Sequence, residues 1–185
     1  MELFQAIFGR QSISKVKPDP VPRALIERVL AAAVQAPNHH RVRPWRFFVL
    51  TGAARSRLGE VMAQSLRRAQ PDIAEQVLDV ERARPLRAPL LIAVAVDQPS
   101  EPKISEIENI CAAAAAAQNL LLAVHALGLA GMWRTGSAAT DPQVKAFLGL
   151  APEQHLIGFV YIGYPEVEWA PKERPSFEDR TVWLE

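Results

Sequence analysis

Two apolar stretches dominate the middle of the chain: L-L-I-A-V-A-V at residues 90–96 and E-I-E-N-I-C-A-A-A-A-A-A-Q-N-L-L-L-A-V-H-A-L at 106–127. The first is a short, continuous apolar run, which is typical of a strand covered on both faces. The second lies within a long alanine-rich helix expected from Ser105 to Leu127 and ended by Gly128. Together they predict a sheet that shares its core with one long central helix.

Shorter helices and strands are expected on either side of this centre, marked by periodic apolar residues and by proline and glycine. Helices are predicted at Glu2–Phe8, Pro22–Gln35, Ala53–Ala69, Asp72–Ala83 and Asp141–Leu148, strands at Trp45–Leu50, Leu129–Trp133, Leu156–Gly163 and Thr181–Leu184, and an extended proline-rich segment at Tyr164–Pro175. This irregular alternation predicts one α+β domain over residues 1–185, with a mixed or antiparallel central sheet packed with helices.

Composition narrows the class of protein. Hydrophobic residues make up 49% of the chain and charged residues 22%, as expected for a folded globular domain. A net charge of +1 does not indicate binding to nucleic acid or to an anionic membrane. The single cysteine, Cys111, excludes an internal disulfide and a cysteine-based zinc site, and it indicates a reducing compartment. A cytoplasmic protein is therefore expected.

The uncharged stretch from Ile110 to Trp133 is long enough to span a bilayer. Against a membrane span, it carries Gln118, Asn119 and His125, its first half is alanine, and acidic residues precede it. A helix buried on most sides, at an interface between two subunits, is the favoured interpretation.

The common catalytic motifs, namely the G-x-G-x-x-G fingerprint, the P-loop, H-E-x-x-H and G-x-S-x-G, do not occur in the sequence. Three polar clusters remain. The first, G-R-Q-S-I-S-K at 9–15, places two cations and two hydroxyls where a helix ends. These donors suit phosphate oxygens, because each charged hydrogen bond contributes about 1.5–3 kcal/mol. A solvated helix end would explain the same residues.

The second cluster, P-N-H-H-R-V-R-P-W at 37–45, links a helix to a strand. Its adjacent histidines suggest a metal, but no carboxylate or cysteine accompanies them, and Arg41 and Arg43 would repel a cation. No metal site is therefore expected. Every side chain from Asn38 to Arg43 except Val42 can donate a hydrogen bond, which favours an anion or a polarised heterocycle.

The third cluster, G-M-W-R-T-G-S at 131–137, follows a buried strand. Arg134 and Thr135 lie between glycines, so both their backbone and their side chains can approach a ligand. A capped strand end, an arginine paired with a surface carboxylate and a tryptophan in the core would explain the same segment.

Taken together, G-R-Q-S-I-S, A-P-N-H-H-R-V-R-P-W-R-F-F-V and G-M-W-R-T-G resemble the flavin-dependent nitroreductase family in their order and placement. The likeness runs from about Leu3 to Leu184. It is nearest to small bacterial members that carry R-R-S, A-P-D-H or A-P-S-S before P-W, and G-x-W-R-[ST]-G. The resemblance implies a homodimer with FMN at the subunit interface. NADH or NADPH would reduce it, and a nitroaromatic, quinone or similar small electron-poor acceptor would reoxidise it in a ping-pong cycle.

The resemblance also assigns cofactor contacts by position. Arg10 and Ser12 match the first and third residues of R-R-S, as donors to the FMN phosphate and ribityl chain. Arg134 with Thr135 matches W-R-[ST] and would complete the phosphate clamp, and residues 37–39 would contact the flavin ring from the other subunit. The expected cofactor-binding residues are Arg10, Gln11, Ser12, Ser14, Gln35, Pro37, Asn38, His39, Arg43, Trp133, Arg134 and Thr135, with Trp133 acting chiefly through its backbone.

The chain departs from the family pattern at several positions. Gln11 replaces the second arginine of R-R-S, and Ser14 stands where the larger family often has a lysine or arginine. Arg41 and Arg43 stand where many relatives have asparagine and glutamine. No catalytic side chain is expected, because flavin N5 itself accepts the hydride and the protein supplies binding, stacking and charge near N1.

Two other functions are compatible with the resemblance. One is an FMN enzyme of the same fold that performs dehalogenation or flavin fragmentation, although the short connections here leave little room for a large lid. The other is a non-catalytic flavin-binding or carrier protein. The proline-rich arm ending in T-V-W-L has no adjacent strand to pair with, so we expect it to be exchanged onto a partner subunit. An arm folded back on its own sheet is the alternative.

Overall fold

The computed structural model of the chain describes residues 1–168, 170 and 172–185. At its centre is a four-stranded sheet with the order β1 (Trp45–Leu50), β2 (Leu90–Val96), β4 (His155–Gly163) and β3 (Ala130–Arg134). All three strand pairings are antiparallel, so the predicted sheet is present in its antiparallel form. β2 is buried at every residue, which confirms the prediction of a strand covered on both faces.

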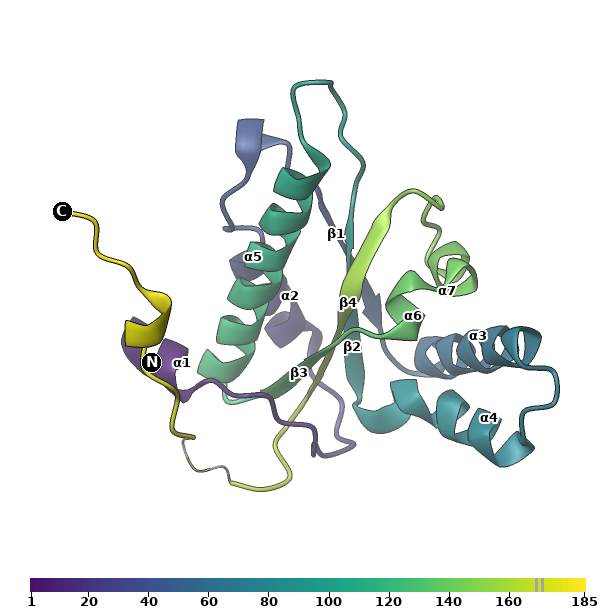
Figure 1. Ribbon diagram of the computed structural model, residues 1–185. Coiled ribbons are helices and arrows are strands. Elements are labelled where there is room, and N and C mark those ends of the chain that lie inside the picture. Colours follow the sequence, from purple (N-terminus) through teal and green to yellow (C-terminus); the bar gives the residue numbers. More distant parts are fainter. Residues whose placement is uncertain (169, 171) are drawn as a thin grey trace.

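Helices cover both faces of the sheet (Figure 1). One face carries α2 (Arg23–Ala33) and α5 (Glu106–Ala126), with α1 (Leu3–Gly9) against α5, and the other carries α3 (Ala53–Ala69), α4 (Glu75–Ala83), α6 (Ser137–Thr140) and α7 (Pro142–Phe147). Among the described residues, short 3-10 helices occur at His39–Arg41, Arg84–Arg87 and Glu178–Arg180. The chain is therefore a three-layer α+β structure, as the fold prediction required.

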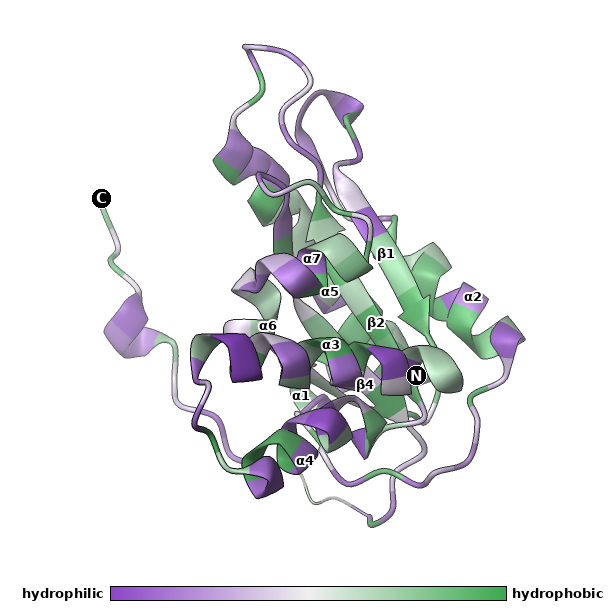
Figure 2. Ribbon diagram, turned by 90° about the vertical axis from the view of Figure 1, so that its right-hand side faces the viewer, coloured by the Kyte–Doolittle hydropathy of each residue, from purple (hydrophilic) through white to green (hydrophobic). Residues whose placement is uncertain are grey.

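Successive side chains of β2 point to opposite faces of the sheet, so the hydrophobic core has two parts. Leu90, Ile92, Val94 and Val96 face the layer of α2 and α5, whereas the alternate residues face α3, α6 and α7. Figure 2 shows the hydrophobic strands behind helices whose outer faces are hydrophilic. This period-two pattern is what the pleat of a strand buried on both sides demands.

α5 is the central core helix. Ser105 caps its start in a reciprocal arrangement with Glu108, and small residues such as Ala113 and Ala117 lie buried on its inner face. By length and composition it is a candidate membrane span, and 44% of its apolar window is buried. It packs against α2 and against strands β1 to β4, so its role here is that of a core helix.

Predicted element boundaries agree with the structure to within a few residues. α4 begins at Glu75 rather than at Asp72, because Pro71 and Asp72 form a turn. Asp141 caps α7 instead of lying within it, since its Oδ1 accepts hydrogen bonds from the backbone N–H groups of Gln143 and Val144. The short helices at 39–41, 84–87 and 137–140 were not predicted.

The predicted strand at Thr181–Leu184 is wrong for the single chain. In the described residues this segment pairs with no strand, and it extends away from the sheet (Figure 1). Val182, Trp183 and Leu184 are 82%, 80% and 92% exposed. Of the extended segment predicted at Tyr164–Pro175, residues 169 and 171 lie outside the described part of the chain.

The segment that follows α1 runs beside two other parts of the chain. Its Ile13 N–H donates to the carbonyl oxygen of Gly131 in β3 (3.1 Å). Further along, Lys17 N–H donates to the carbonyl oxygen of Tyr164 (2.8 Å), and Val16 forms an isolated bridge with Pro165. The first polar cluster is thereby fixed beside the outer edge of β3.

Candidate functional site

Three basic side chains from distant parts of the sequence meet where α1 ends. Arg10 follows α1, and its backbone N–H donates to the carbonyl oxygen of Ala6 (3.1 Å). The guanidinium of Arg174, in the C-terminal arm, donates to the carbonyl oxygen of Arg10 (3.1 Å). His125, in the last turn of α5, lies so close to Gly9 that an added Cβ there would come within 3.0 Å of its Nε2. We call Arg10, His125 and Arg174 the basic cluster.

Arg10 brings positive charge into the basic cluster. Within the described chain, no carboxylate pairs with the guanidinium of Arg10. Burial lowers the pKa of Arg10, and the charge of Arg174 lowers it further. Burial also lowers the pKa of His125, and the charge of Arg10 adds to that effect. Since a bound anion would relieve this repulsion, the donor set fits a phosphate group.

The neighbouring residues of the first cluster have separate roles. Ser12 and Ser14 are exposed, so their hydroxyls are open to a ligand. Gln11 is buried, and its Nε2 donates to the carbonyl oxygen of Ala170 (2.8 Å). Gln11 therefore ties the C-terminal arm to the body of the protein, and the arm in turn carries Arg174 to Arg10.

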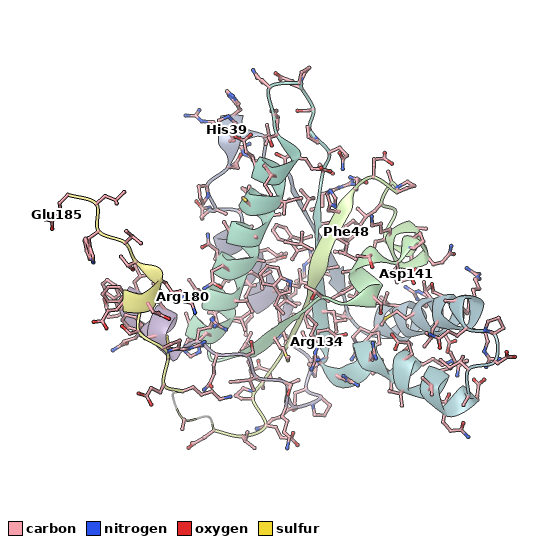
Figure 3. The ribbon with its side chains drawn as sticks, in the orientation of Figure 1. His39, Phe48, Arg134, Asp141, Arg180 and Glu185 are labelled. Carbon is pink, nitrogen blue, oxygen red and sulfur yellow. The ribbon has the colours of Figure 1, made fainter. Side chains whose placement is uncertain are left out.

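The second cluster lies at the opposite end of α5. Nε2 of His39 is 3.8 Å from Oε1 of Glu108, near the start of the helix, while His125 is in its last turn. Residues 108 and 125 are separated by roughly 25 Å at 1.5 Å per helical residue. Figure 3 shows His39 beside the start of α5. One chain alone does not bring these two clusters together.

The loop of the second cluster is held by its own backbone geometry. Asn38 Oδ1 accepts a hydrogen bond from the backbone N–H of Arg43 (2.8 Å), which closes the turn. His40, Arg41 and Arg43 have φ values of 48°, 58° and 49°. Such left-handed conformations are uncommon outside glycine and cluster at ligand sites, so this strained loop supports a binding role. The nearby Gln35 is exposed, and its Nε2 donates to the carbonyl oxygen of Ala31 (3.3 Å).

In the third cluster, Trp133 is hydrogen-bonded to β4 at a point where the pairing of β4 with β2 is irregular. The register between β2 and β4 shifts between Val94 and Ala95, which leaves Ile157 as an extra residue. The indole N–H of Trp133 donates to the freed carbonyl oxygen of Ile157 (3.0 Å). Gly158 has φ +138°, and an added Cβ there would lie 2.5 Å from Trp133 Nε1. The carbonyl oxygen of Arg134 would be equally close, so position 158 has no room for a side chain.

Arg134 points to the opposite face of the sheet from the basic cluster. Its guanidinium carbon lies 5.5 Å from the centre of the Tyr161 ring, and it lines a cavity of about 260 Å³ on the side of α3 and α4. Arg84 and Arg87 line the same cavity, together with Thr135. Sequence reasoning missed both of these arginines, because only the fold brings the 3-10 turn at 84–87 beside the end of β3.

β3 connects the basic cluster with this cavity. It is an edge strand, and among the described residues no strand pairs with its outer side. The segment after Arg10 is bonded to Gly131 at one end of β3, and Arg134 lies at the other, roughly 10 Å away at 3.3 Å per residue. Arg10 and Arg134 are therefore separated along a strand edge and do not form one clamp within a chain.

An antiparallel sheet between helical layers, with basic groups at both ends of an edge strand, defines a small α+β protein. The model of the nitroreductase family matches residues 7–164, and the chain belongs to this family. The Escherichia coli K12 protein named "Putative NAD(P)H nitroreductase YdjA" is 31% identical over 169 residues, covering 91% of each chain. A Bacillus subtilis protein with the same type of name, YfhC, is 30% identical and covers 94% of this chain and 90% of its own.

Solved structures show the same fold. A nitroreductase-like family protein from Bacillus cereus superposes with a TM-score of 0.84 at 24% identity, covering 100% of this chain and 97% of its own. A nitroreductase from Bacteroides fragilis with bound FMN has a TM-score of 0.75 at 22% identity, with both chains fully covered. The fold prediction and the family resemblance are thereby confirmed.

Proposed function

We propose that this protein is an FMN-dependent oxidoreductase that takes electrons from NADH or NADPH and passes them to an electron-poor acceptor in a ping-pong cycle. The basic cluster is the observation that carries the proposal, because it offers a partly buried, unneutralised cation where a phosphate would bind. Family membership supports it, as do the names of relatives that bind FMN or NADPH. With a nitroaromatic acceptor, NAD(P)H and one proton would convert the nitro group to nitroso and release NAD(P)⁺ and water.

The residues present fit FMN, but the residues that would bind its phosphate differ from those expected from the sequence. Arg10, Arg174 and Ser12 would hold the phosphate, and residues 133–135 would line the remainder of the cofactor along the edge of β3. We expected Arg10 and Arg134 to share the phosphate. Instead, the side chain of Arg134 lies over Tyr161 on the other face of the sheet. Trp133 contributes through its backbone in this proposal, since its indole is bonded within the sheet.

FMN, when bound, supplies the hydride and electron transfer chemistry. The chain supplies charge and position. Arg84, Arg87 and Arg134 gather at the end of β3, and positive charge there favours the uptake of electrons by a neighbouring acceptor group. Gln11 holds the arm that carries Arg174, and the indole of Trp133 fixes residues 133–135 against β4. No nucleophilic side chain and no metal enters this proposal.

We further propose a homodimer in which α5 lies at the interface and the C-terminal arm is exchanged. The single chain exposes Phe4 and Phe8 on α1, and Trp183 in the arm. Phe4 and Phe8 stack with ring centres 5.9 Å apart, and exposed large apolar side chains such as these are typical of an interaction surface. A second copy could also bring its own residues 37–39 to the basic cluster, from which they are separated within one chain. A single domain over residues 1–185 and a cytoplasmic location belong to the same proposal.

Purification under air tests the function directly. We expect a yellow protein that NADH or NADPH bleaches without oxygen and that a nitroaromatic or a quinone then restores to yellow. Protein that is yellow but inert to both nicotinamides would instead be a flavin carrier. Protein that never binds FMN, even after reconstitution, would refute the proposal.

A further inference from the structure

A cavity of about 600 Å³ lies where β1 ends, between α2, the start of α3 and the segment that precedes α2. Its volume is within the range of about 300–1,000 Å³ that is typical of small-molecule sites. β1 and β3 are the two outer strands of the sheet, so this cavity and the basic cluster lie at opposite edges. We call it the β1 groove.

The walls of the β1 groove are mainly aliphatic. Within the described part of the chain, none of the side chains that line it is aromatic. Arg23 and Glu27 stand at its rim, where both are exposed and pair with each other (Nε to Oε1, 2.8 Å). The groove therefore suits an alkyl chain. Its main apolar lining residues are Pro18, Pro20, Ile26, Leu30, Val49 and Pro89.

Arg55 brings a third charge to the β1 groove, and this charge has no acidic partner. Its Nη1 donates to the carbonyl oxygen of Ala88 (2.6 Å), which fixes the guanidinium in place. Its Nε is buried and has no hydrogen-bond partner among the described residues. Glu27, in the same groove, is already paired with Arg23. The guanidinium of Arg55 is thus held in position, partly shielded from water, with only a neutral carbonyl beside it.

The start of α3 adds to the attraction for an anion. Gly52 is the N-cap residue, so in the described structure no side chain caps this helix, and its first turn contains no acidic residue. Gly52 and Thr51 both line the groove. The first backbone N–H groups of a long helix carry partial positive charge. The guanidinium of Arg55 and the start of the helix therefore act on the same cavity.

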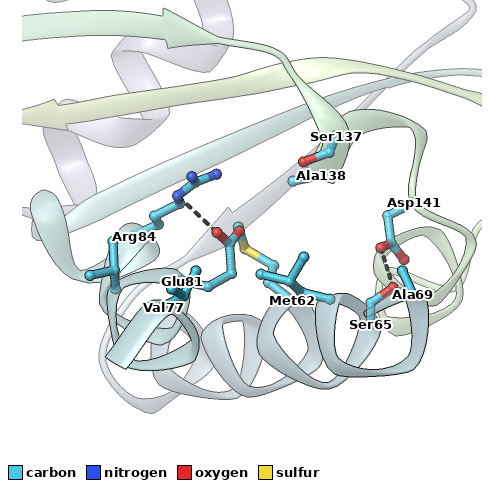
Figure 4. Close-up of a pocket in the computed structure, with 11 residues that line it drawn as sticks. Met62, Ser65, Ala69, Val77, Glu81, Arg84, Ser137, Ala138 and Asp141 are labelled. Carbon is cyan, nitrogen blue, oxygen red and sulfur yellow. Dashed lines mark hydrogen bonds and ion pairs between the residues drawn. The ribbon is translucent and has the colours of Figure 1, made fainter. Parts of the chain in front are cut away.

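The cavity between α3 and α4 does not share this property (Figure 4). Glu81 forms an ion pair with Arg84 there (Oε2 to Nε, 3.0 Å), and the carboxylate of Asp141 accepts a hydrogen bond from the hydroxyl of Ser65. These charged groups already have partners within the chain. The β1 groove differs because its buried cation lacks one.

We propose that the β1 groove binds an aliphatic monocarboxylate of medium chain length, a ligand distinct from the cofactor and from the electron acceptor. Its carboxylate would accept hydrogen bonds from the guanidinium of Arg55, and its alkyl chain would lie against Ile26 and Leu30 of α2. Carboxylate and guanidinium match in planar geometry, and burial of each methylene group adds affinity. The proposal is independent of the proposed function, since the groove lies away from the basic cluster.

Calorimetry with octanoate, hexanoate and octan-1-ol on the purified protein separates the two parts of this recognition. Octanoate should bind about fifteenfold more tightly than hexanoate, because each buried methylene group corresponds to about a fourfold gain in affinity. Octan-1-ol keeps the chain and lacks the charge, so it should bind about tenfold more weakly than octanoate.

Two variants test the charged contact. Arg55→Gln should weaken octanoate binding about tenfold and change octan-1-ol binding less than about twofold. Arg57→Gln is its control, since Arg57 is exposed on the same helix and lies outside the groove. Because Arg55→Gln also loses the bond to Ala88, Thr51→Glu is the second variant: it supplies a carboxylate from the chain itself and should compete with octanoate, weakening its binding about tenfold. The neutral Thr51→Gln should not.

The outcomes decide the assignment. Wild-type protein that does not bind octanoate, or binds it no better than hexanoate, would overturn the proposal. An equal loss of octanoate and octan-1-ol affinity in Arg55→Gln, together with unchanged octanoate affinity in Thr51→Glu, would overturn it as well. Displacement of octanoate by FMN would place it in the cofactor site instead. Octanoate binding about tenfold tighter in Trp183→Asp than in wild type would show that the arm of a second copy fills the groove.

Discussion

Replacing Arg10 by alanine tests the basic cluster most directly, and riboflavin provides the matched ligand because it lacks only the phosphate of FMN. Arg10 is partly buried, without a carboxylate partner in the described chain, and it lies beside a second guanidinium. A bound phosphate would therefore be its main counter-charge. The variant should lose affinity for FMN and keep its affinity for riboflavin.

The size of the effect follows from the contact that is removed. A hydrogen bond between charged groups contributes about 1.5–3 kcal/mol, and about 1.4 kcal/mol corresponds to a factor of ten in Kd. Arg10→Ala should therefore weaken FMN binding by roughly 10- to 150-fold, and Arg174→Ala by the lower part of that range because Arg174 is exposed. Arg180→Ala, which removes an exposed arginine paired with Asp179, should change neither affinity.

Fluorescence quenching of each flavin by the apoprotein gives the affinities of the wild type and of the three variants for FMN and for riboflavin. An equal loss of FMN and riboflavin affinity in Arg10→Ala would mean that Arg10 supports the fold of the site and does not bind the phosphate. Unchanged FMN affinity in both Arg10→Ala and Arg174→Ala would remove the basic cluster from the cofactor site. Raised salt should weaken FMN binding more than riboflavin binding, since the contact is charged.

Three further expectations concern assembly, pH and packing. Trp183→Asp should raise the dimer dissociation constant at least tenfold in sedimentation experiments, because burying a tryptophan contributes on the order of 1.5–3 kcal/mol; an unchanged constant would exclude the arm from the interface. Because the pKa of His125 is lowered in the folded protein, the unfolded chain binds this proton more tightly. The stability of the apoprotein should therefore fall as the pH drops below about 6.5. In urea titrations, His125→Gln should make the unfolding free energy depend less on pH. Arg10→Ala should raise the pKa of His125 by NMR, and a static value would show that their charges do not interact. Gly59→Ala should cost about 1–3 kcal/mol or more in unfolding free energy, since its Cβ would lie 2.2 Å from the carbonyl oxygen of Arg82, whereas the exposed Ser56→Ala should be nearly neutral.

Much of the fold is predictable because its signals are local. The apolar run at 90–96 and the alanine-rich helix that Gly128 ends produce the sheet and its central helix where expected. Arg10 was identified as a site residue because it belongs to a short motif, and the structure places it in a basic cluster. Its role toward a cofactor stays a prediction.

The residues that sequence reasoning missed depend on long-range packing. Arg174 reaches Arg10 across 164 residues of chain, because Gln11 holds the arm that carries it. Arg84 and Arg87 occupy a turn without a motif, and they join Arg134 only after the sheet has formed. The strand predicted at 181–184 has β propensity but no partner in one chain, and propensity alone does not form a strand.

The interlock between Trp133 and Gly158 has an evolutionary consequence. A side chain at 158 would meet both the indole of Trp133 and the backbone carbonyl oxygen of Arg134, each 2.5 Å from the added Cβ, and φ there is +138°. The glycine at 158 should therefore persist in homologues even where position 133 is not tryptophan, since removing the indole leaves the backbone contact with Arg134 in place. Trp133→Phe should lower thermal stability by the loss of the indole hydrogen bond, and it should not rescue a side chain placed at 158.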